Sequence, residues 1–230
     1  MIDFAFRYFR IMTIIKNFYY YLYSLYFCLR YLPLKQAVKI PILVSPHIKI
    51  GILKRGGIVL DGFIWHSKII MGLPGAEGRA SQKTMISIHK DCHLIFRGNA
   101  TLAEGTRIII RKGNLSIGNH FYCNCNCIFD CSDIIDIGND NMYGWNINFN
   151  NTDGHTFYEN GKIKDNHGSI KIGNHVWIAS YCNIFKNTEI ADNCVVAQNS
   201  LVSRKFSNPN FLIGGIPAKE IKGNINWDRK

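Results

Sequence analysis

The residue of this sequence best suited to acid–base chemistry is His155, which ends the stretch Asn-Thr-Asp-Gly-His. An imidazole titrates near neutral pH, so it can take a proton from a hydroxyl group and pass it on. We therefore expect His155 to act as a general base. Asp153 stands two residues earlier and either orients this imidazole, binds a substrate hydroxyl or forms an Asx turn. We interpret the competing residues His167 and His175 as surface histidines.

Four cysteines are closely spaced in the pattern C-x-C-x-C-x3-C: Cys123, Cys125, Cys127 and Cys131. Zinc sites usually combine C-x2-C pairs with a second, distant pair or with histidines. Cys127, Cys182 and Cys194 also stand at positions where the repeat described below requires a small residue. We therefore interpret these cysteines as reduced, small, buried residues and expect no metal.

Composition and charge restrict the class of protein and of partner. With 230 residues, 47% hydrophobic and 19% charged, the chain suits one folded domain with an appendage. The net charge of +11 favours anionic partners such as phosphates, nucleotide-linked sugars, acidic glycans or an anionic membrane surface. Because no nucleic-acid-binding motif accompanies this charge, we expect no nucleic-acid partner.

The elements that position His155 are indicated by a six-residue repeat. Residues 170–205 carry an aliphatic side chain at every sixth position: Ile172, Ile178, Ile184, Ile190, Val196 and Val202. Neither a helix nor a simple two-faced strand has this period, whereas a short strand followed by a sharp corner does. Three such units close a triangular coil. This geometry predicts that Ile172 stacks under Ile190, Ile178 under Val196 and Ile184 under Val202.

The same rhythm begins earlier, with longer spacers, near Ile88 and Leu94. Three Gly–Asn pairs, at residues 118–119, 138–139 and 173–174, suit corners that need left-handed backbone angles. Residues 148–171 leave the rhythm and rejoin it at Ile170. A loop thrown out from an otherwise regular solenoid is a natural place for chemistry.

Three stretches carry a resemblance to a known family: 172–180 (IGNHVWIAS), 195–204 (VVAQNSLVSR) and 214–223 (GGIPAKEIKG). They resemble the hexapeptide-repeat acyltransferases in order and spacing. The resemblance implies an all-β fold, a left-handed parallel β-helix, with acetyl-CoA as donor and a homotrimer as the assembly. In this family a histidine at the place that His155 occupies, in a D-x-H context, is the general base of acyl transfer.

The resemblance also implies a donor site in a groove between neighbouring subunits. The residues that it assigns to this site are Trp177, Ala179, Ser180, Ala197, Gln198, Ser203, Arg204, Lys219 and Lys222. The small corner residues contact the pantetheine arm, Ser203 and Arg204 lie near the nucleotide end, and the two lysines meet the phosphates. We expect the tetrahedral oxyanion to be stabilised by a backbone N–H near Ala179 or Ser180. Gln198–Asn199 replaces the family's usual Ala-Gly, which predicts a narrower or more polar groove.

The chain divides into three parts. Residues 1–34 form a helical segment, residues 35–215 form the β-helix with a loop at 150–170, and residues 216–230 form a cap in which Pro217 opens a short C-terminal helix. Residues 1–32 are rich in aromatic and basic residues, but their longest uncharged run is shorter than the roughly 20 residues that span a membrane. The segment is either an interfacial membrane helix or a helix packed on a neighbouring subunit or on the β-helix.

These observations favour one function among several. The first hypothesis is an O-acetyltransferase that modifies a saccharide or glycolipid hydroxyl in surface polysaccharide assembly. It is located in the cytoplasm, either free or peripheral at the inner membrane face. The second is an acetyltransferase for a small soluble acceptor, such as an amino-sugar nucleotide, serine or a drug. A non-catalytic solenoid scaffold is the third. A zinc enzyme of the carbonic-anhydrase type is not expected. It needs two histidine ligands five residues apart, whereas His89 and His93 are four apart.

Overall fold

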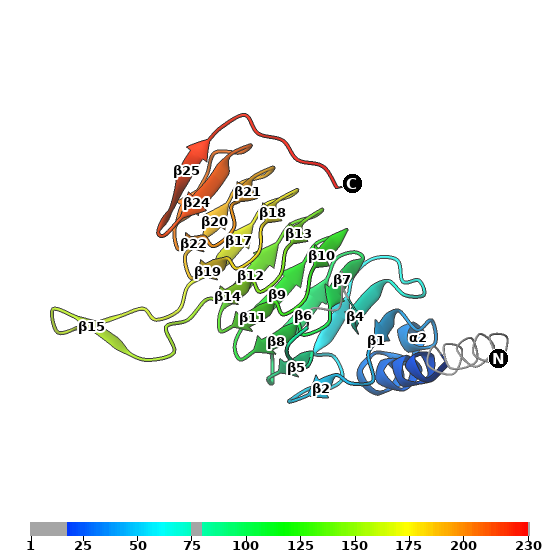
Figure 1. Ribbon diagram of the computed structural model, residues 1–230. Coiled ribbons are helices and arrows are strands. Elements are labelled where there is room, and N and C mark those ends of the chain that lie inside the picture. The colour runs from blue at the N-terminus through cyan, green and yellow to red at the C-terminus, as the bar shows by residue number, and fades with distance from the viewer. Residues whose placement is uncertain (1–17, 75–79, 230) are drawn as a thin grey trace, which may run out of the picture.

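The computed structural model describes residues 18–74 and 80–229, and its main body is a three-sided column of stacked β-strands (Figure 1). We call its three sheets faces A, B and C. Face A contains β1 (Ile42–Val44), β4 (Ile69–Leu73), β7 (Ala100–Ala103), β10 (Phe121–Cys123), β13 (Met142–Tyr143), β18 (Trp177–Ile178), β21 (Val195–Val196), β24 (Leu212–Gly215) and β25 (Ala218–Lys222). Face B contains β2 (Lys49–Ile50), β5 (Met85–Ile88), β8 (Arg107–Ile110), β11 (Ile128–Cys131), β14 (Asn148–Asn150), β19 (Asn183–Phe185) and β22 (Leu201–Val202). Face C contains β3 (Ile58–Leu60), β6 (His93–Phe96), β9 (Asn114–Ile117), β12 (Ile134–Ile137), β17 (Ile170–Ile172), β20 (Glu189–Ile190) and β23 (Lys205–Phe206).

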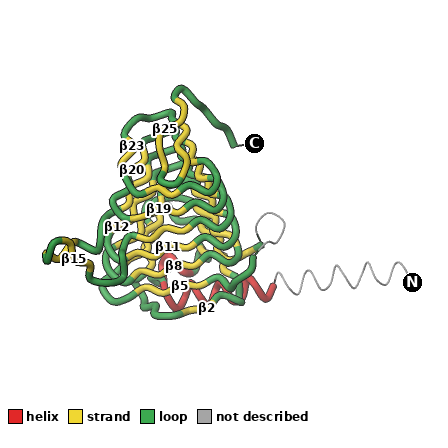
Figure 2. Tube along the Cα trace, turned by 60° about the vertical axis from the view of Figure 1, so that its left-hand side comes forward, coloured by secondary structure: helices red, strands yellow, loops and turns green. Residues whose placement is uncertain are grey.

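The chain visits the faces in the order A, B, C, and each turn adds one strand to every face. All strand pairs within the faces are parallel except β24 with β25. The fold is therefore the parallel β-helix that the six-residue repeat predicts. Figure 2 shows its strands as stacked rungs, with the hairpin of β15 (Phe157–Glu159) and β16 (Lys162–Lys164) projecting from the side. We name the edges between faces the A/B, B/C and C/A corners.

The predicted stacking of the repeat is confirmed on each face. Ile172 pairs with Ile190 on face C, Ile178 with Val196 on face A, and Ile184 with Val202 on face B. All six side chains are buried, because inward-facing positions of successive coils stack in a continuous aliphatic core. The middle of the core also holds stacked aromatic rings, including Phe129 on Phe149 with ring centroids 5.0 Å apart.

The Gly–Asn pairs do not have the role that the sequence suggested. Beside these pairs the residues with left-handed backbone angles are His120, Asp140 and His175, with φ of 55°, 57° and 53°, each one position after the asparagine. The glycines are instead needed because successive coils touch at this corner. A Cβ added to Gly138 lies 2.5 Å from the carbonyl oxygen of Gly173, closer than any side chain tolerates.

The asparagines of the same pairs form a ladder along the C/A corner. The side-chain oxygen of Asn139 accepts from the backbone N–H of Asn119 at 2.8 Å, and Asn174 accepts from the N–H of Asn139 at 2.9 Å. Asp192 continues the ladder by accepting from the N–H of Asn174 at 2.7 Å. Each side chain thus satisfies a backbone donor of the coil before it, which a corner outside the sheets otherwise leaves to solvent.

The helix at the start of the described chain, residues 18–31, packs against the first coil of the β-helix. Phe27, Cys28 and Leu32 are buried in the same core as the strands, and the hydroxyl of Ser24 accepts from the N–H of Val44 at 2.9 Å. A short helix, α2 (Leu34–Ala37), follows. Packing on the β-helix, one of the alternatives for this segment, is therefore correct for residues 18–32, while residues 1–17 lie outside the described chain. No helix in the described ranges is long and apolar enough to cross a membrane.

The expected C-terminal helix is wrong. Pro217 stands in the turn between β24 and β25, which pair antiparallel, and residues 223–229 continue without a helix. The physical reason is the last coil of face A, whose open edge would leave a row of unpaired N–H and C=O groups. A strand supplies hydrogen bonds to that edge, whereas a helix supplies none.

Crowding at the C/A corner predicts the cost of a single methyl group. Gly138→Ala should lower the free energy of unfolding by about 3 kcal/mol, because its Cβ must push two coils apart. Gly56→Ala is the matched control, since Gly56 has φ +91° but nothing within 4 Å of the added Cβ; it should cost about 1 kcal/mol. Chemical denaturation of both variants tests this, and an equal or larger loss for Gly56→Ala contradicts it.

Candidate active site

The loop that carries His155 leaves the column at the B/C corner. It follows β14 on face B and returns to β17 on face C, and its outer part is the β15–β16 hairpin. Its two limbs are joined at the base, where the N–H of Asp153 donates to the carbonyl of Asn166 at 2.8 Å and Thr152 pairs with His167. This base holds the residues just beyond it against the wall of the β-helix.

His155 lies immediately outside the joined base, in a hollow of about 380 Å³ that Asp153, Thr156 and Phe157 also line. The side chain is exposed, and its ring nitrogens have no hydrogen-bond partner among the described residues. Its backbone carbonyl accepts from the side-chain amide of Asn166 at 3.3 Å. The main chain at His155 is thus held while the imidazole stays free to bind a substrate group.

The carboxylate of Asp153 is paired with a lysine of the next coil and not with the His155 ring. Its carboxylate receives the ammonium of Lys186 at 2.5 Å, and the same ammonium donates to the carbonyl of Asp165 at 2.8 Å. Lys186 stands at the B/C corner of the next coil, with its side chain 22% exposed. One lysine therefore clamps both limbs of the loop to the column.

The structure divides the predicted donor residues between two corners. Ala179, Ser180, Ala197 and Gln198 lie together at the A/B corner on successive coils, where Ala179 N–H donates to the carbonyl of Val196 at 2.9 Å. Ser203 and Arg204 lie at the B/C corner, after β22, on the same edge as the loop of His155. Face B separates the two groups, so one protomer alone does not bring all of them together.

The remaining predicted donor residues lie on face A. Lys219 and Lys222 are exposed on β25, at the top of the column. Trp177 is half-buried on β18, and its ring packs beside that of Trp227 from the C-terminal tail, with centroids 6.2 Å apart. The tail therefore packs against one side of the Trp177 ring.

One of the two suggested oxyanion donors is excluded. The N–H of Ala179 is already committed to Val196 in the ladder of face A, so it cannot stabilise an oxyanion. Ser180 remains the candidate. Its side chain is buried, and its hydroxyl accepts from the N–H of Trp145 at 3.0 Å, which fixes this turn of the A/B corner.

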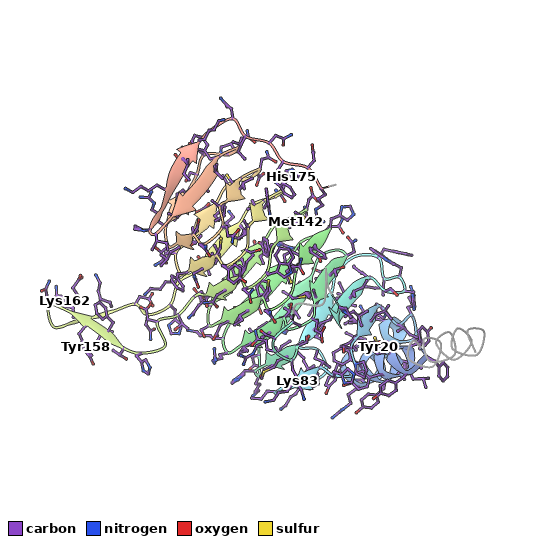
Figure 3. All side chains as sticks on the ribbon, viewed as in Figure 1. Tyr20, Lys83, Met142, Tyr158, Lys162 and His175 are labelled. Carbon is purple, nitrogen blue, oxygen red and sulfur yellow. The ribbon has the colours of Figure 1, made fainter. Side chains whose placement is uncertain are left out.

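His175 is not the surface histidine that we expected. Its Nδ1 faces a carboxylate oxygen of Asp140 at 2.5 Å, its Nε2 faces the carbonyl of Trp227 at 2.9 Å, and its ring stacks on the Trp227 indole at 4.1 Å between centroids. Arg229 then donates to the carbonyls of His120 and Asn141, each at 2.6 Å. His175 thus anchors the C-terminal tail down the C/A corner (Figure 3).

The cysteines are buried, as their small-residue interpretation requires. Burial raises the pKa of the Cys131 thiol to about 12, and the thiol donates to the carbonyl of Asp133 at 3.3 Å. The pKa of Cys127 is also raised well above its usual value, first of all by burial. Within residues 18–74 and 80–229 no group of side chains is arranged to hold a metal ion.

This chain is similar in sequence to two known proteins and in structure to a third. No family model matches it. An uncharacterized 24.8 kDa protein in the cps region of Klebsiella pneumoniae is 32% identical over 199 residues, which is 86% of each chain. The polysialic acid O-acetyltransferase of Neisseria meningitidis is 36% identical over 147 residues, 63% of this chain and 59% of that protein. Among solved structures, a polysialic-acid-specific acetyltransferase superposes with a TM-score of 0.49 at 18% identity, over 82% of this chain and 83% of that one.

The lysine clamp gives a prediction about the loop that does not depend on any activity. Lys186→Met should accelerate hydrogen exchange of the Asp153 and Gly168 amides by roughly tenfold, because both limbs lose their tie to the column. Lys171→Met is the control, since Lys171 is exposed on face C and its ammonium is 4.0 Å from Glu189. Exchange that is unchanged in Lys186→Met, or equally fast in the control, contradicts the clamp.

Proposed function

This chain belongs to the hexapeptide-repeat acyltransferases, enzymes built on a left-handed parallel β-helix, and we propose that it transfers the acetyl group of acetyl-CoA to a hydroxyl of a surface polysaccharide. The observation that carries the proposal is the imidazole of His155, which has no hydrogen-bond partner among residues 18–74 and 80–229 and is held at the edge of a hollow by a clamped loop. Because the members of this family are enzymes, membership favours a catalytic function over a non-catalytic scaffold.

In the proposed reaction the Nε2 or Nδ1 atom of His155 accepts the proton of the sugar hydroxyl as the oxygen attacks the thioester carbonyl. The carbonyl oxygen becomes an oxyanion, for which the N–H of Ser180 is the proposed donor. When the carbon–sulfur bond breaks, the imidazolium returns its proton to the departing thiolate. The products are the O-acetyl sugar and free CoA, and the imidazole is regenerated. Asp153 and Lys186 hold the loop that positions the imidazole.

The proposed donor groove runs between protomers of a cyclic trimer. The reason is the division of the donor residues between the A/B and B/C corners, which a single protomer leaves on opposite sides of face B. Packing the B/C corner of one protomer against the A/B corner of the next joins His155 of one chain to Ser180 of the other. The side chains of Arg204, Lys219 and Lys222 are exposed, which suits them for the phosphates of CoA.

The acceptor class is supported by the relatives. One is encoded in a cps region and the other is a polysialic acid O-acetyltransferase, so we propose a saccharide of a capsule or related surface polymer as acceptor. The net charge of +11 favours an anionic polymer over a neutral one. A small soluble acceptor stays the alternative.

The role of His155 predicts a large and specific loss. Acetyl-CoA-dependent release of thiol in the presence of a capsular oligosaccharide should fall roughly 100-fold or more in His155→Gln, because the hydroxyl loses its base. His47→Gln is the control, since His47 is exposed in the first coil, between β1 and β2. Near wild-type turnover in His155→Gln, with the oligosaccharide acetylated, removes this residue from the mechanism.

We also propose that the N-terminal end of the column contacts the cytoplasmic face of an anionic membrane, where a lipid-linked acceptor is assembled. Helix 18–31 buries one side and exposes Phe18, Leu22, Tyr26 and Leu29 on the other, one per turn. Beside it the exposed rings of Phe63 and Trp65 stack, and His66 stacks on Tyr21. The exposed basic side chains of residues 18–68 are Arg30, Lys35, Lys39, Lys49, Lys54 and Arg55, whereas Lys68 is buried. The only acid in that range is Asp61, and aromatic rings among cations suit an anionic bilayer surface.

This contact is tested with point variants, because deleting the helix would expose the core that Phe27 and Leu32 cover. The triple variant Leu22→Ser, Tyr26→Ser, Phe63→Ser should bind vesicles containing phosphatidylglycerol about tenfold more weakly than wild type in a flotation assay. The control is Tyr158→Ser, Ile163→Ser, which removes exposed apolar side chains of the projecting hairpin. Equal flotation of the triple variant and wild type rules out this surface.

A further inference from the structure

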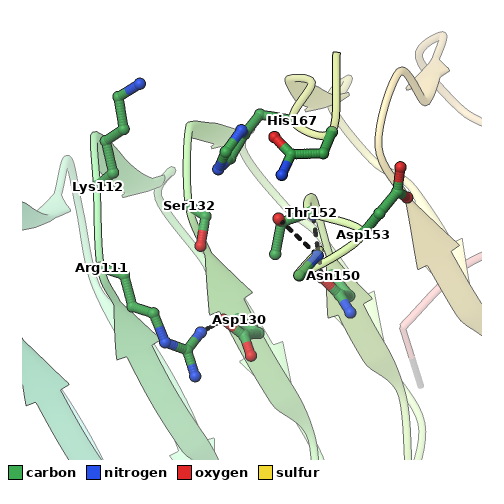
Figure 4. A pocket seen from close by; sticks show the side chains of 10 residues that line it. Arg111, Lys112, Asp130, Ser132, Asn150, Thr152, Asp153 and His167 are labelled. Atoms are coloured by element: carbon green, nitrogen blue, oxygen red, sulfur yellow. Dashed lines mark hydrogen bonds and ion pairs between the residues drawn. The ribbon is translucent and has the colours of Figure 1, made fainter. Parts of the chain in front are cut away.

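A second hollow, of about 450 Å³, lies at the B/C corner beside the hollow of His155 (Figure 4). Asp153 lines both, so the two are neighbours. The floor of the second hollow is formed by the ends of β8, β11 and β14. Its roof is the returning limb of the loop at Asn166 and His167. The volume is in the range of pockets that bind small molecules, about 300–1,000 Å³.

The second hollow lies on the opposite side of the loop from the proposed donor residues. In face B the strands stack in the order β8, β11, β14, β19, β22. The hollow spans the first three, whereas Ser203 and Arg204 follow β22. A donor bound near Arg204 therefore approaches His155 from one end of the column and leaves the second hollow open to the acceptor.

The charges in the second hollow leave one cation without a partner. Of its two acids, Asp130 is bound by Arg111 and Asp153 by Lys186. The Lys112 ammonium is exposed and has no ion-pair partner among the described residues. Because each acid is already neutralised by a neighbouring cation, the hollow presents the positive charge of Lys112 to whatever enters.

Two further groups in the hollow are free to make hydrogen bonds. Ser132 is 5% exposed, and its hydroxyl has no partner in the described part of the chain. The ring of His167 likewise has none there, and Figure 4 shows both side chains facing the same space. A hydroxyl and an imidazole can each donate to or accept from sugar hydroxyl groups. Lys112 supplies charge and the other two supply hydrogen bonds.

We propose that this hollow binds a sugar residue carrying one negative charge, a carboxylate or a phosphodiester, next to the sugar that is acetylated. Lys112 binds the anionic group, while Ser132 and His167 bind hydroxyl groups of the same residue. The inference rests on the proposed function, because it treats the neighbouring hollow as the place of acetyl transfer. It deepens that function because the enzyme then selects its acceptor by the charge of the sugar next to the one that is acetylated.

Direct binding to the full chain tests the hollow without requiring turnover. The probes are an oligosaccharide with one carboxylate per repeat, the same oligosaccharide after reduction of its carboxyl groups, and a phosphodiester-linked oligosaccharide. Calorimetry should show that wild type binds at least one charged probe about tenfold more tightly than the reduced one. Lys112→Gln should lose this preference while its affinity for the reduced probe stays the same.

Lys162→Gln is the matched control, because it removes the same charge from the exposed hairpin strand β16, at the far end of the loop (Figure 3). It should keep the preference for the charged probe. Comparing the affinities for the carboxylate and phosphodiester oligosaccharides identifies which anion the hollow binds. Equal binding of charged and reduced probes by wild type, or an unaltered preference in Lys112→Gln, overturns the proposal.

Kinetics separate failure of this proposal from failure of the proposed function. With a charged acceptor, Lys112→Gln should raise KM about tenfold and leave kcat within about twofold, because the lost contact exists equally in the ground and transition states. Acetyl transfer that depends on His155 but not on Lys112 sinks the charged-sugar site alone. Preference for the charged probe without any acetyl transfer sinks the proposed function and leaves the binding site in place.

Discussion

The close contact between successive coils at the C/A corner is the constraint on which the rest of the structure depends. At Gly118, Gly138 and Gly173 the next coil approaches so closely that no side chain fits, and the ladder of Asn139, Asn174 and Asp192 ties the coils by hydrogen bonds. Backbone contact at one edge fixes the rise of every turn. Side chains a full turn apart in sequence, such as Arg111 and Asp130, therefore meet across successive rungs of the column.

This regularity also explains how the column accepts a long insertion. The strands on either side of the loop keep their register: β14 pairs with β19 and β12 with β17 without a shift. The insertion is thus confined to the B/C corner and does not disturb the C/A corner, where the coils touch. The joined base and Lys186 hold the loop at His155 close to the column, while the hairpin beyond it is exposed to solvent.

The sequence predicts what depends on local spacing and misses what depends on contacts between distant residues. The six-residue period predicted the strands and the pairing of Ile172 with Ile190, because each residue of a coil repeats the environment of the one below. The contact of Lys186 with Asp153 joins residues 33 positions apart, and that of His175 with Trp227 joins residues 52 apart. A repeat in the sequence does not indicate which of these distant side chains meet. The strand after Pro217 was missed for a related reason, since the need for it arises from the open edge of the last coil.

A three-sided column places a limit on how a two-substrate site can be built. Each corner carries one row, or file, of side chains along the column. The rows of two corners are separated by a face and point in different directions. The loop of His155 uses the B/C corner, and the small residues suited to a pantetheine arm use the A/B corner. Two such files can face one another only when columns stand side by side, so the proposed groove needs an assembly of protomers. Within the protomer, what remains at the B/C corner below the loop is the hollow with Lys112. In the proposed reaction, the chain that contributes the general base also selects the acceptor and binds the donor at Ser203 and Arg204, while its neighbour supplies the small residues of the A/B corner.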